Sequence, residues 1–359
     1  MQNGHDHTPA SADEIYQEQI LQHVSRTFAL TIPQLPAGLR TVISNAYLLC
    51  RIADTIEDDN SLTHGQTRQF SNMFIDVVAG RASAQVFADE LYPLLSDHTL
   101  PAEHDLIKHA PAVLRITHSF NPNQRRALER CIRIMAKGMA DYQDAETLEG
   151  LKDLPAMDEY CYYVAGVVGE MLTELFCDYS EEINKNREEM MALAVSFGQG
   201  LQMTNILKDL WEDRKRGACW LPRDVFEREG FSLTGMNPGS RDERFQRGLG
   251  LLIGVARDHL QDALRYTLLI PPHETGIRRF CLWALGMAVL TLNKLNTRRN
   301  FSSGAEVKIS RRSVRATVLS TSLLARSNRA LKLLFDLTSR NLPANSIREK
   351  LNKIGCSSI

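Results

Sequence analysis

Two distant stretches of this chain place polar side chains along one face of a helix. The first stretch, YLLCRIADTIEDD, has them at steps of four, three and four residues: Tyr47, Arg51, Asp54 and Asp58. The second, QMTNILKDLWED, has them at steps of three, four and four: Gln202, Asn205, Asp209 and Asp213. Because residues three or four positions apart lie on the same side of an α-helix, each set forms a row. We call these sets the first ladder and the second ladder.

Each ladder has two interpretations. A DxxxD spacing is ordinarily a solvated helix face with salt bridges. However, the second ladder adds the neutral amides of Gln202 and Asn205 to its carboxylates, and in the first ladder Arg51 precedes Asp54. Crowded carboxylates take up protons or bind cations, and a few carboxylate oxygens suit a magnesium ion that also contacts phosphate. Two such ladders facing each other therefore predict a magnesium diphosphate site between helices.

The rest of the chain also shows helical periodicity, and no alternating strand pattern of useful length occurs. The ranges predicted as helices are 14–28, 37–58, 66–80, 84–95, 105–118, 122–145, 156–179, 241–269, 279–295 and 314–338, besides the helix that carries the second ladder. The fold class predicted is all-α, a single-domain helical bundle with a central active-site cleft. We expect a disordered lead over residues 1–12, the helical domain over 13–340 and a tail over 341–359.

Composition excludes several function classes. With 42 Lys and Arg against 43 Asp and Glu, the net charge of -1 gives no global field for nucleic acid. The seven cysteines are scattered without a CxxC pair, which is typical of reduced thiols in a cytoplasmic protein. The first residues have no signal-peptide pattern, and the apolar run from Phe280 to Leu292 has the length of a buried helix. We expect a cytoplasmic protein without a transmembrane segment; loose, peripheral membrane association stays open.

Three further features have a structural and a functional interpretation. Ala165, Gly166 and Gly169 stand where bulky residues are expected in a helix, which indicates close approach by a ligand or by a neighbouring helix. Tyr160, Tyr163 and Tyr266 are either ordinary core residues or aromatic groups that stabilise a carbocation and relay its proton. The basic run KISRRSVR, with Lys308, Arg311 and Arg312, is either a solvated face or a site for the phosphates of a nicotinamide cofactor.

Four ordered motifs resemble those of the squalene/phytoene synthase family of head-to-head prenyl transferases. They are SRTFA at 25–29, YLLCRIADTIEDD at 47–59, YCYYVAGVVGE at 160–170 and FGQGLQMTNILKDLWEDRKRG at 197–217. The resemblance extends from about Ser25 to Ala316 and implies the isoprenoid synthase type of helical bundle. One departure is Lys208, which stands before Asp209 where the family pattern leads us to expect arginine.

The resemblance implies roles for individual residues. Four aspartates would hold magnesium ions, or manganese in their place, that bind and ionise farnesyl diphosphate: Asp54, Asp58, Asp209 and Asp213. Tyr160 would act in the first half-reaction. The substrate-binding positions are Ser25, Arg26, Phe28, Tyr47, Arg51, Gln202, Asn205, Tyr266 and Phe280, and we add Gly169 because a small residue there leaves room for a C15 chain.

The reaction implied has two stages. Two farnesyl diphosphates first condense to presqualene diphosphate, which then rearranges and is reduced by NADPH to squalene, a precursor of sterols or hopanoids. The segments 278–292 and 307–314 resemble those of the reductive branch of the family. The alternatives are a dehydrosqualene, phytoene or presqualene diphosphate synthase without the reductive step. A noncatalytic family member that acts as a binding or assembly protein is a further alternative, although such a protein should have lost aspartates that this chain keeps.

Overall fold

The computed structural model describes residues 11–25, 27–143 and 147–344. Within these ranges every regular element is helical, and the only strand-like pairing is an isolated bridge between Leu151 and Pro222. The all-α prediction is therefore confirmed. The described residues divide into two compact units, the first within 11–33 and 37–137 and the second within 34–36 and 138–344. The single domain over 13–340 stays a prediction, and the predicted lead and tail lie mostly outside the described residues.

The first unit is organised around α3 (Ala37–Asp58), which packs on α1, α4, α6 and α7. Asn45 is fully buried at the centre of these contacts. Its side-chain amide donates to the Val113 carbonyl and to Gln17, and its oxygen accepts from the Thr117 hydroxyl. A buried amide with all its bonds made fixes the rotation of a helix against its neighbours. The other elements are α1 (Ala12–Val24), α2 (Phe28–Thr31), η1 (Ile32–Gln34), α4 (His64–Val78), α5 (Ala84–Leu91), η2 (Tyr92–Leu94), α6 (Pro101–Lys108), α7 (Ala110–Ser119) and α8 (Pro122–Gln143), of which η1 and α8 continue into the second unit.

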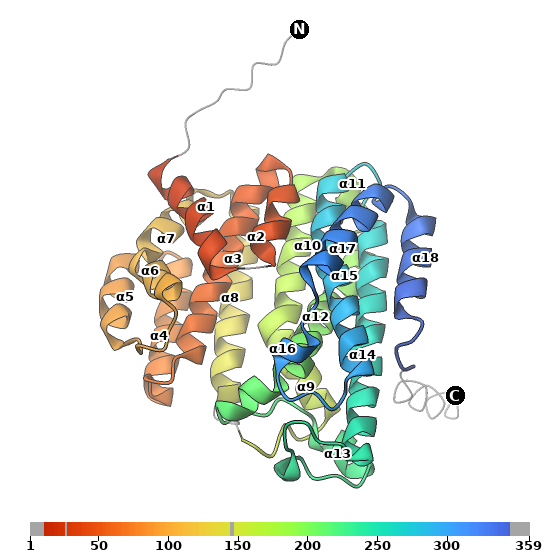
Figure 1. Cartoon of the computed structure of the whole chain (residues 1–359). Coiled ribbons are helices and arrows are strands. Elements are labelled where there is room, and N and C mark those ends of the chain that lie inside the picture. The colour runs from red at the N-terminus through yellow and green to blue at the C-terminus, as the bar shows by residue number, and fades with distance from the viewer. Residues whose placement is uncertain (1–10, 26, 144–146, 345–359) are drawn as a thin grey trace, which may run out of the picture. The chain divides into compact units, whose positions relative to one another are not determined.

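The second unit is built around α12 (Arg187–Lys215), which packs on α10, α14 and α15 (Figure 1). The close approach depends on glycine: a Cβ on Gly198 would lie 2.1 Å from the Ala165 carbonyl oxygen. Such a distance excludes any side chain. The other elements are α9 (Leu154–Cys161), η3 (Tyr162–Gly166), α10 (Val167–Tyr179), α11 (Glu181–Asn184), α13 (Arg223–Arg228), η4 (Leu233–Gly235), α14 (Glu243–Leu269), α15 (Thr275–Thr297), α16 (Gly304–Val307), α17 (Arg311–Leu324) and α18 (Asn328–Ser339).

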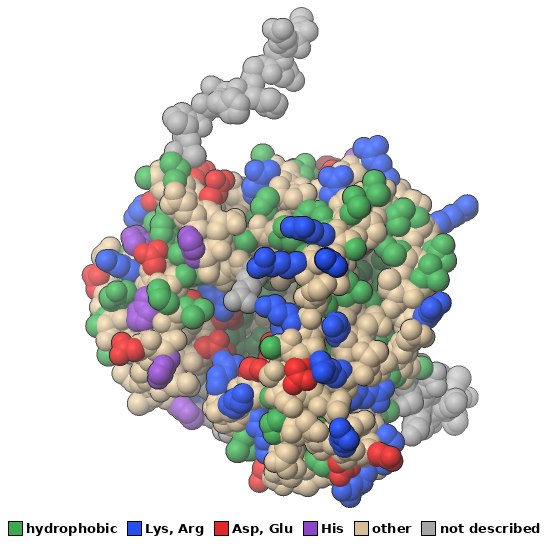
Figure 2. Space-filling model, in the orientation of Figure 1, with side chains coloured by type: hydrophobic (Ala, Val, Ile, Leu, Met, Phe, Trp, Pro, Cys, Tyr) green, Lys and Arg blue, Asp and Glu red, His purple; other side chains and the backbone are tan. Residues whose placement is uncertain are grey.

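Three predicted helices are interrupted in the structure, and one of them, 105–118, breaks at His109 between α6 and α7. The range 156–179 contains a π-helical turn, η3, between α9 and α10. The range 314–338 breaks into α17 and α18, because Ser327 caps the second helix by accepting a hydrogen bond from the Ala330 amide. Over these last two helices, hydrophobic side chains reach the surface among Lys and Arg (Figure 2).

By length and composition α15 could cross a membrane, but 67% of its most apolar window is buried within the protein. Burial of this kind is typical of the core helix of a globular unit. The prediction that the run from Phe280 to Leu292 forms a buried helix is therefore confirmed.

Candidate functional site

Arg51 is the centre of the first ladder. Its Nη2 donates to the Tyr47 hydroxyl at 3.4 Å, while its Nη1 lies 3.8 Å from Asp54 Oδ2 and 3.5 Å from Glu103 Oε1. The Tyr47 hydroxyl in turn donates to the Val24 carbonyl at 3.0 Å. The Nε of Arg51 is buried and has no hydrogen-bond partner among the described residues. A buried donor without an acceptor is costly, so this guanidinium is suited to receive an anion.

The electrostatics of this ladder also favour a cation near Asp54. Burial raises the pKa of Asp54 to about 6; Arg51 opposes the shift, and the carboxylates of Asp58 and Glu103 add to it. Burial lowers the pKa of Arg51, but Asp54, Tyr47 and Glu103 together raise this pKa by more than burial lowers it, so the guanidinium stays charged. A metal ion beside Asp54 would return its carboxylate to the ionised form.

Asp58 and Asp59 end α3 in different environments. Asp58 is exposed at the C-terminus of the helix, where the helix dipole disfavours a carboxylate and favours a cation. Asp59 is buried and accepts hydrogen bonds from Ser61, Ser96 and Thr99. Burial raises the pKa of Asp59, but these hydrogen bonds outweigh it and leave the pKa below its usual value. Asp59 is therefore a structural carboxylate, whereas Asp54 is half-buried and Asp58 exposed, and their binding of a ligand stays a prediction.

Ser25 and Phe28 lie beside the first ladder. The Ser25 hydroxyl accepts from the Phe28 amide at 3.0 Å, and the rings of Phe28 and Tyr47 are 5.3 Å apart. Arg26, also predicted to bind substrate, lies outside the described residues. Glu103 was missed by the sequence analysis; it belongs to α6, and no spacing relates it to Arg51.

Lys208 bridges two polar side chains of the second ladder, Asn205 and Asp209. Its Nζ lies 3.0 Å from Asp209 Oδ2 and donates to Asn205 Oδ1 at 3.4 Å. Asn205 is exposed, and Gln202, one turn earlier, is half-buried. The lysine that departs from the family pattern therefore still places a cation beside the first carboxylate of this ladder.

The end of the second ladder is held by neighbouring groups. Asp213 is 8% exposed, and its Oδ1 accepts from Arg216 Nη2 at 2.6 Å. The Glu212 carboxylate accepts from the Gly304 amide at 3.0 Å, and a Cβ on Gly304 would lie 3.2 Å from Asp209 Oδ1. Gly304 begins α16, so the turn before the basic run at Lys308, Arg311 and Arg312 packs directly on the second ladder. Arg311 and Arg312 are exposed at the start of α17.

Tyr160 is 5% exposed and stacks on Trp220, with ring centroids 4.0 Å apart and an angle of 4° between the rings. Tyr142 packs on it from another side at 5.3 Å. The π-helical turn begins directly after α9, which carries Tyr160, and such turns occur frequently at functional sites. Tyr163 lies nearer the surface, where its hydroxyl donates to Glu159 at 3.1 Å.

Tyr266 and Phe280 both contact α10. The Tyr266 hydroxyl pairs with the Thr173 hydroxyl at 2.9 Å, and its ring meets Phe197 edge-on at 5.5 Å. Phe280 meets Phe176 edge-on at 6.3 Å. Burial raises the pKa of Tyr266 well above its usual value, so its hydroxyl stays protonated. These side chains form an apolar, aromatic region within the second unit.

Gly169 does not face an open space. A Cβ at this position would lie 2.1 Å from the carbonyl oxygen of Ala194 on α12. Gly166 is similarly enclosed by Tyr162 and Val195. The expectation that Gly169 leaves room for substrate is therefore wrong: its missing side chain allows α10 to pack on α12, which is the other of the two interpretations of this glycine.

A second polar cluster was missed by the sequence analysis. His259 Nδ1 lies 3.2 Å from the Ser196 hydroxyl, and His259 Nε2 lies 3.9 Å from Asp158 Oδ1. The Asp158 oxygen is buried without a hydrogen bond among the described residues, and burial raises the pKa of Asp158 to about 6. Asp158 is two residues before Tyr160, so its position was visible in the sequence, but nothing there indicated His259 as its neighbour.

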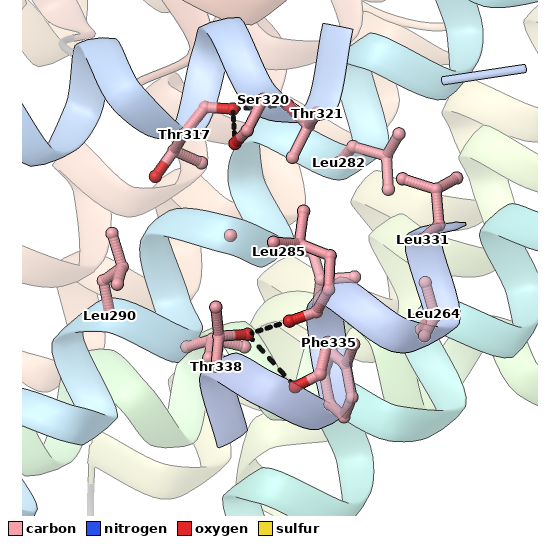
Figure 3. A pocket seen from close by; sticks show the side chains of 13 residues that line it. Leu264, Leu282, Leu285, Leu290, Thr317, Ser320, Thr321, Leu331, Phe335 and Thr338 are labelled. Carbon is pink, nitrogen blue, oxygen red and sulfur yellow. Dashed lines mark hydrogen bonds between the residues drawn. The ribbon is translucent and has the colours of Figure 1, made fainter. Parts of the chain in front are cut away.

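A cavity of about 70 Å³ opens between α14, α15, α17 and α18 (Figure 3). Leucines and Phe335 line most of it, and the hydroxyls of Thr317 and Thr338 bond to carbonyls of their own helices. None of the predicted site residues lines this cavity. We therefore regard it as a packing defect beneath α17 and α18 and not as the substrate pocket.

The donor groups fit magnesium held jointly with a diphosphate. Among the described residues, no group of three or more His, Cys, Asp or Glu side chains forms a closed metal cage. Magnesium commonly takes one or two carboxylates and completes its shell with water and phosphate oxygens. The unpartnered Nε of Arg51 would serve the same diphosphate. The ladders belong to different units, and their meeting in one cleft stays a prediction.

Comparison with known proteins was consistent across sequence and structure. A family model described as squalene/phytoene synthase matches residues 21–313. A squalene synthase from Cyberlindnera jadinii is 29% identical over 296 residues, which are 81% of this chain and 63% of the relative. One from Candida albicans is 30% identical over 283 residues, 76% of this chain and 60% of the relative. The chain thus spans about three fifths of the length of the curated relatives it matches.

Solved structures share the fold. The TcSQS complex with the ligand BPH1237 aligns with a TM-score of 0.68 at 21% identity, covering 92% of this chain and 98% of that one. A dehydrosqualene synthase aligns with a TM-score of 0.65 at 20% identity, covering 88% and 97%. The squalene synthase HpnC from Alicyclobacillus acidocaldarius aligns with a TM-score of 0.56 at 16% identity, covering 82% and 98%. At these identities the likeness establishes the isoprenoid synthase type of helical fold.

Proposed function

The chain belongs to the squalene/phytoene synthase family, and on that premise we propose that it condenses two farnesyl diphosphates to presqualene diphosphate and reduces this intermediate to squalene with NADPH. The observation that carries the proposal is the first ladder, where a charged, half-buried Arg51, whose buried Nε has no partner among the described residues, lies beside Asp54. A cation and a carboxylate so placed can bind a phosphate oxygen and a metal ion side by side.

Each ladder contributes one cation and two carboxylates to the site that would bind the diphosphates and their magnesium ions. Arg51 and Lys208 would bind phosphate oxygens directly. The carboxylates would hold the magnesium ions: Asp54, Asp58, Asp209 and Asp213. Magnesium, or manganese in its place, would neutralise the charge that develops on the departing diphosphate. To bind magnesium, Asp213 would have to give up part of its ion pair with Arg216.

The apolar groups of the second unit would protect the carbocation. Tyr160, stacked on Trp220, offers an aromatic group and a hydroxyl close to the π-helical turn. The hydroxyl would position the proton that is lost when the cyclopropane forms, while Tyr266 and Phe280 exclude water from the second stage. Ser25, Phe28, Tyr47, Gln202 and Asn205 would line the substrate path, and Arg26 is proposed from sequence alone.

The reductive step is supported by the position of α16. Because Gly304 packs against Asp209 and Glu212, the basic run that follows begins close to the second ladder. Lys308, Arg311 and Arg312 would bind the phosphates of NADPH, which would supply the hydride that ends the second stage. We further propose that the protein works in the cytoplasm and that its product is a precursor of sterols or hopanoids.

The test is product identification. Purified protein is incubated with farnesyl diphosphate and magnesium, with and without NADPH, and the hydrocarbons are analysed by mass spectrometry. Squalene formed only with NADPH is the expected result. Dehydrosqualene, or presqualene diphosphate that persists with NADPH, would refute the reductive step. A C40 product from geranylgeranyl diphosphate would indicate phytoene synthesis, and the absence of any condensation would favour a binding or assembly role.

A further inference from the structure

Four leucines on α17 and α18 are directed into solvent. Leu319 is 62% exposed and Leu323 74%, while Leu333 is 59% and Leu337 53% exposed. The opposite sides of the two helices are packed, since Thr317 and Thr321 on α17 and Leu331 and Phe335 on α18 are buried. Exposed apolar side chains that are rimmed by polar residues are a feature of interaction surfaces.

The two helices repeat one pattern. In α17 an arginine is followed by two leucines at steps of four residues: Arg315, Leu319 and Leu323. In α18 the same order recurs at the same steps: Arg329, Leu333 and Leu337. Residues at steps of four follow one side of a helix, so each helix presents an apolar stripe that begins at an arginine. We call the two stripes together the leucine face.

The charge around the leucine face differs from that of the rest of the chain. Residues 311–340 contain seven exposed Lys and Arg and one acidic residue, Asp336, a net charge of +6 in a chain whose total is -1. Within the part of the chain that the structure describes, none of the seven forms a salt bridge. They are Arg311, Arg312, Arg315, Arg326, Arg329, Lys332 and Arg340. Figure 2 shows Lys and Arg interspersed with hydrophobic side chains over these helices.

We propose that the leucine face docks on an anionic lipid bilayer. Helices that lie in a membrane interface combine a leucine stripe with Lys and Arg, which contact the lipid phosphates while the leucines enter the acyl boundary. A second copy of the chain is disfavoured as the occupant, because a symmetric dimer would bring six positive charges against six. The four leucines, Arg315 and Arg329 have no part in the proposed function, so docking can be tested apart from it; if both hold, the leucine face gives an apolar product a direct route into lipid.

The experiment measures flotation of the full chain with vesicles in the absence of substrate. We compare pure phosphatidylcholine with the same lipid containing about 30% phosphatidylglycerol. The expected result is binding to the anionic vesicles that weakens at about 0.5 M NaCl. The variant with all four leucines of the face changed to glutamine should bind at least about tenfold more weakly. The matched control is Leu100→Gln with Leu148→Gln, which removes exposed leucines on other segments and should bind like the wild type.

The leucines are exposed, so the fourfold variant should keep its fold, which circular dichroism and thermal melting check directly. Arg315→Gln with Arg329→Gln should lower binding to the anionic vesicles and leave the weak binding to pure phosphatidylcholine unchanged. Failure of the wild type to float, or equal flotation of the fourfold variant, would overturn the proposal. So would a wild-type dimer that the leucine substitutions convert to a monomer in light scattering, because the face would then join two copies.

Discussion

The contact between Gly169 and α12 predicts the effect of adding a single methyl group. Alanine in place of a helical glycine gains about 1 kcal/mol from helix propensity. At Gly169, however, the new Cβ would lie 2.1 Å from the Ala194 carbonyl oxygen. The obstacle is backbone, which cannot move without displacing α12, so the cost belongs to the upper part of the range of about 1–3 kcal/mol for overpacking.

The expected net loss for Gly169→Ala is about 2 kcal/mol, or roughly 4–8 °C in Tm for a unit of this size. The matched control is Gly65→Ala on α4, where the nearest group to the new Cβ is the Thr63 hydroxyl oxygen at 4.0 Å. It should stabilise the protein by about 0.5–1 kcal/mol. Thermal melting by circular dichroism is measured for both variants beside their condensation activity. If Gly169→Ala melts like the wild type but loses activity, the glycine makes room for substrate and the packing argument is refuted.

Three other predictions follow from the site. Asp54→Asn and Asp209→Asn should each lower condensation of farnesyl diphosphate by on the order of 10²–10³, whereas Asp89→Asn on the surface of α5 should not, as product assays with magnesium will check. Tyr160→Phe keeps the ring stacking on Trp220 and removes only the hydroxyl, so the variant should stay folded while presqualene diphosphate forms about 10²-fold more slowly in single-turnover measurements. Burial raises the pKa of Asp158 from 3.8 to about 6, so the folded chain binds this proton more tightly than the unfolded chain does. The protonated carboxyl therefore stabilises the fold fully below the unfolded pKa, and this stabilisation is lost as the pH rises through about 6. The Tm of Asp158→Asn relative to the wild type should therefore rise between about pH 4 and pH 6 and stay level above that, and a difference that does not change with pH would contradict the assignment.

The helix positions were predictable where a continuous periodic pattern was present. The range 37–58, which carries the first ladder, coincides with α3. This agreement arises because the apolar positions Leu48, Leu49 and Ile52 mark one buried side and leave Arg51 and Asp54 on another. Local spacing therefore determined which side chains share a face.

The partners of these side chains depend on distant segments and were not predictable. Glu103 reaches Arg51 from α6, Gly304 approaches Asp209 from α16, and Trp220 stacks on Tyr160 from a loop. Each contact depends on how helices far apart in the chain pack together. The sequence pattern at Gly169 was recognised as unusual, but only the position of Ala194 showed that the space is filled by backbone.

The π-helical turn between Tyr162 and Gly166 also sets how far Gly169 on α10 is rotated about the helix axis from Tyr160 on α9. An α-helix rotates about 100° per residue, and a π turn accommodates an additional residue. Replacing the turn by α-helical geometry without deleting a residue would rotate α10 by about 100° relative to α9. Tyr160 could then stay on Trp220, or Gly169 could stay against Ala194, but both contacts could not survive together. The turn therefore lets this segment hold one more residue than a continuous α-helix would, while both side chains keep their partners.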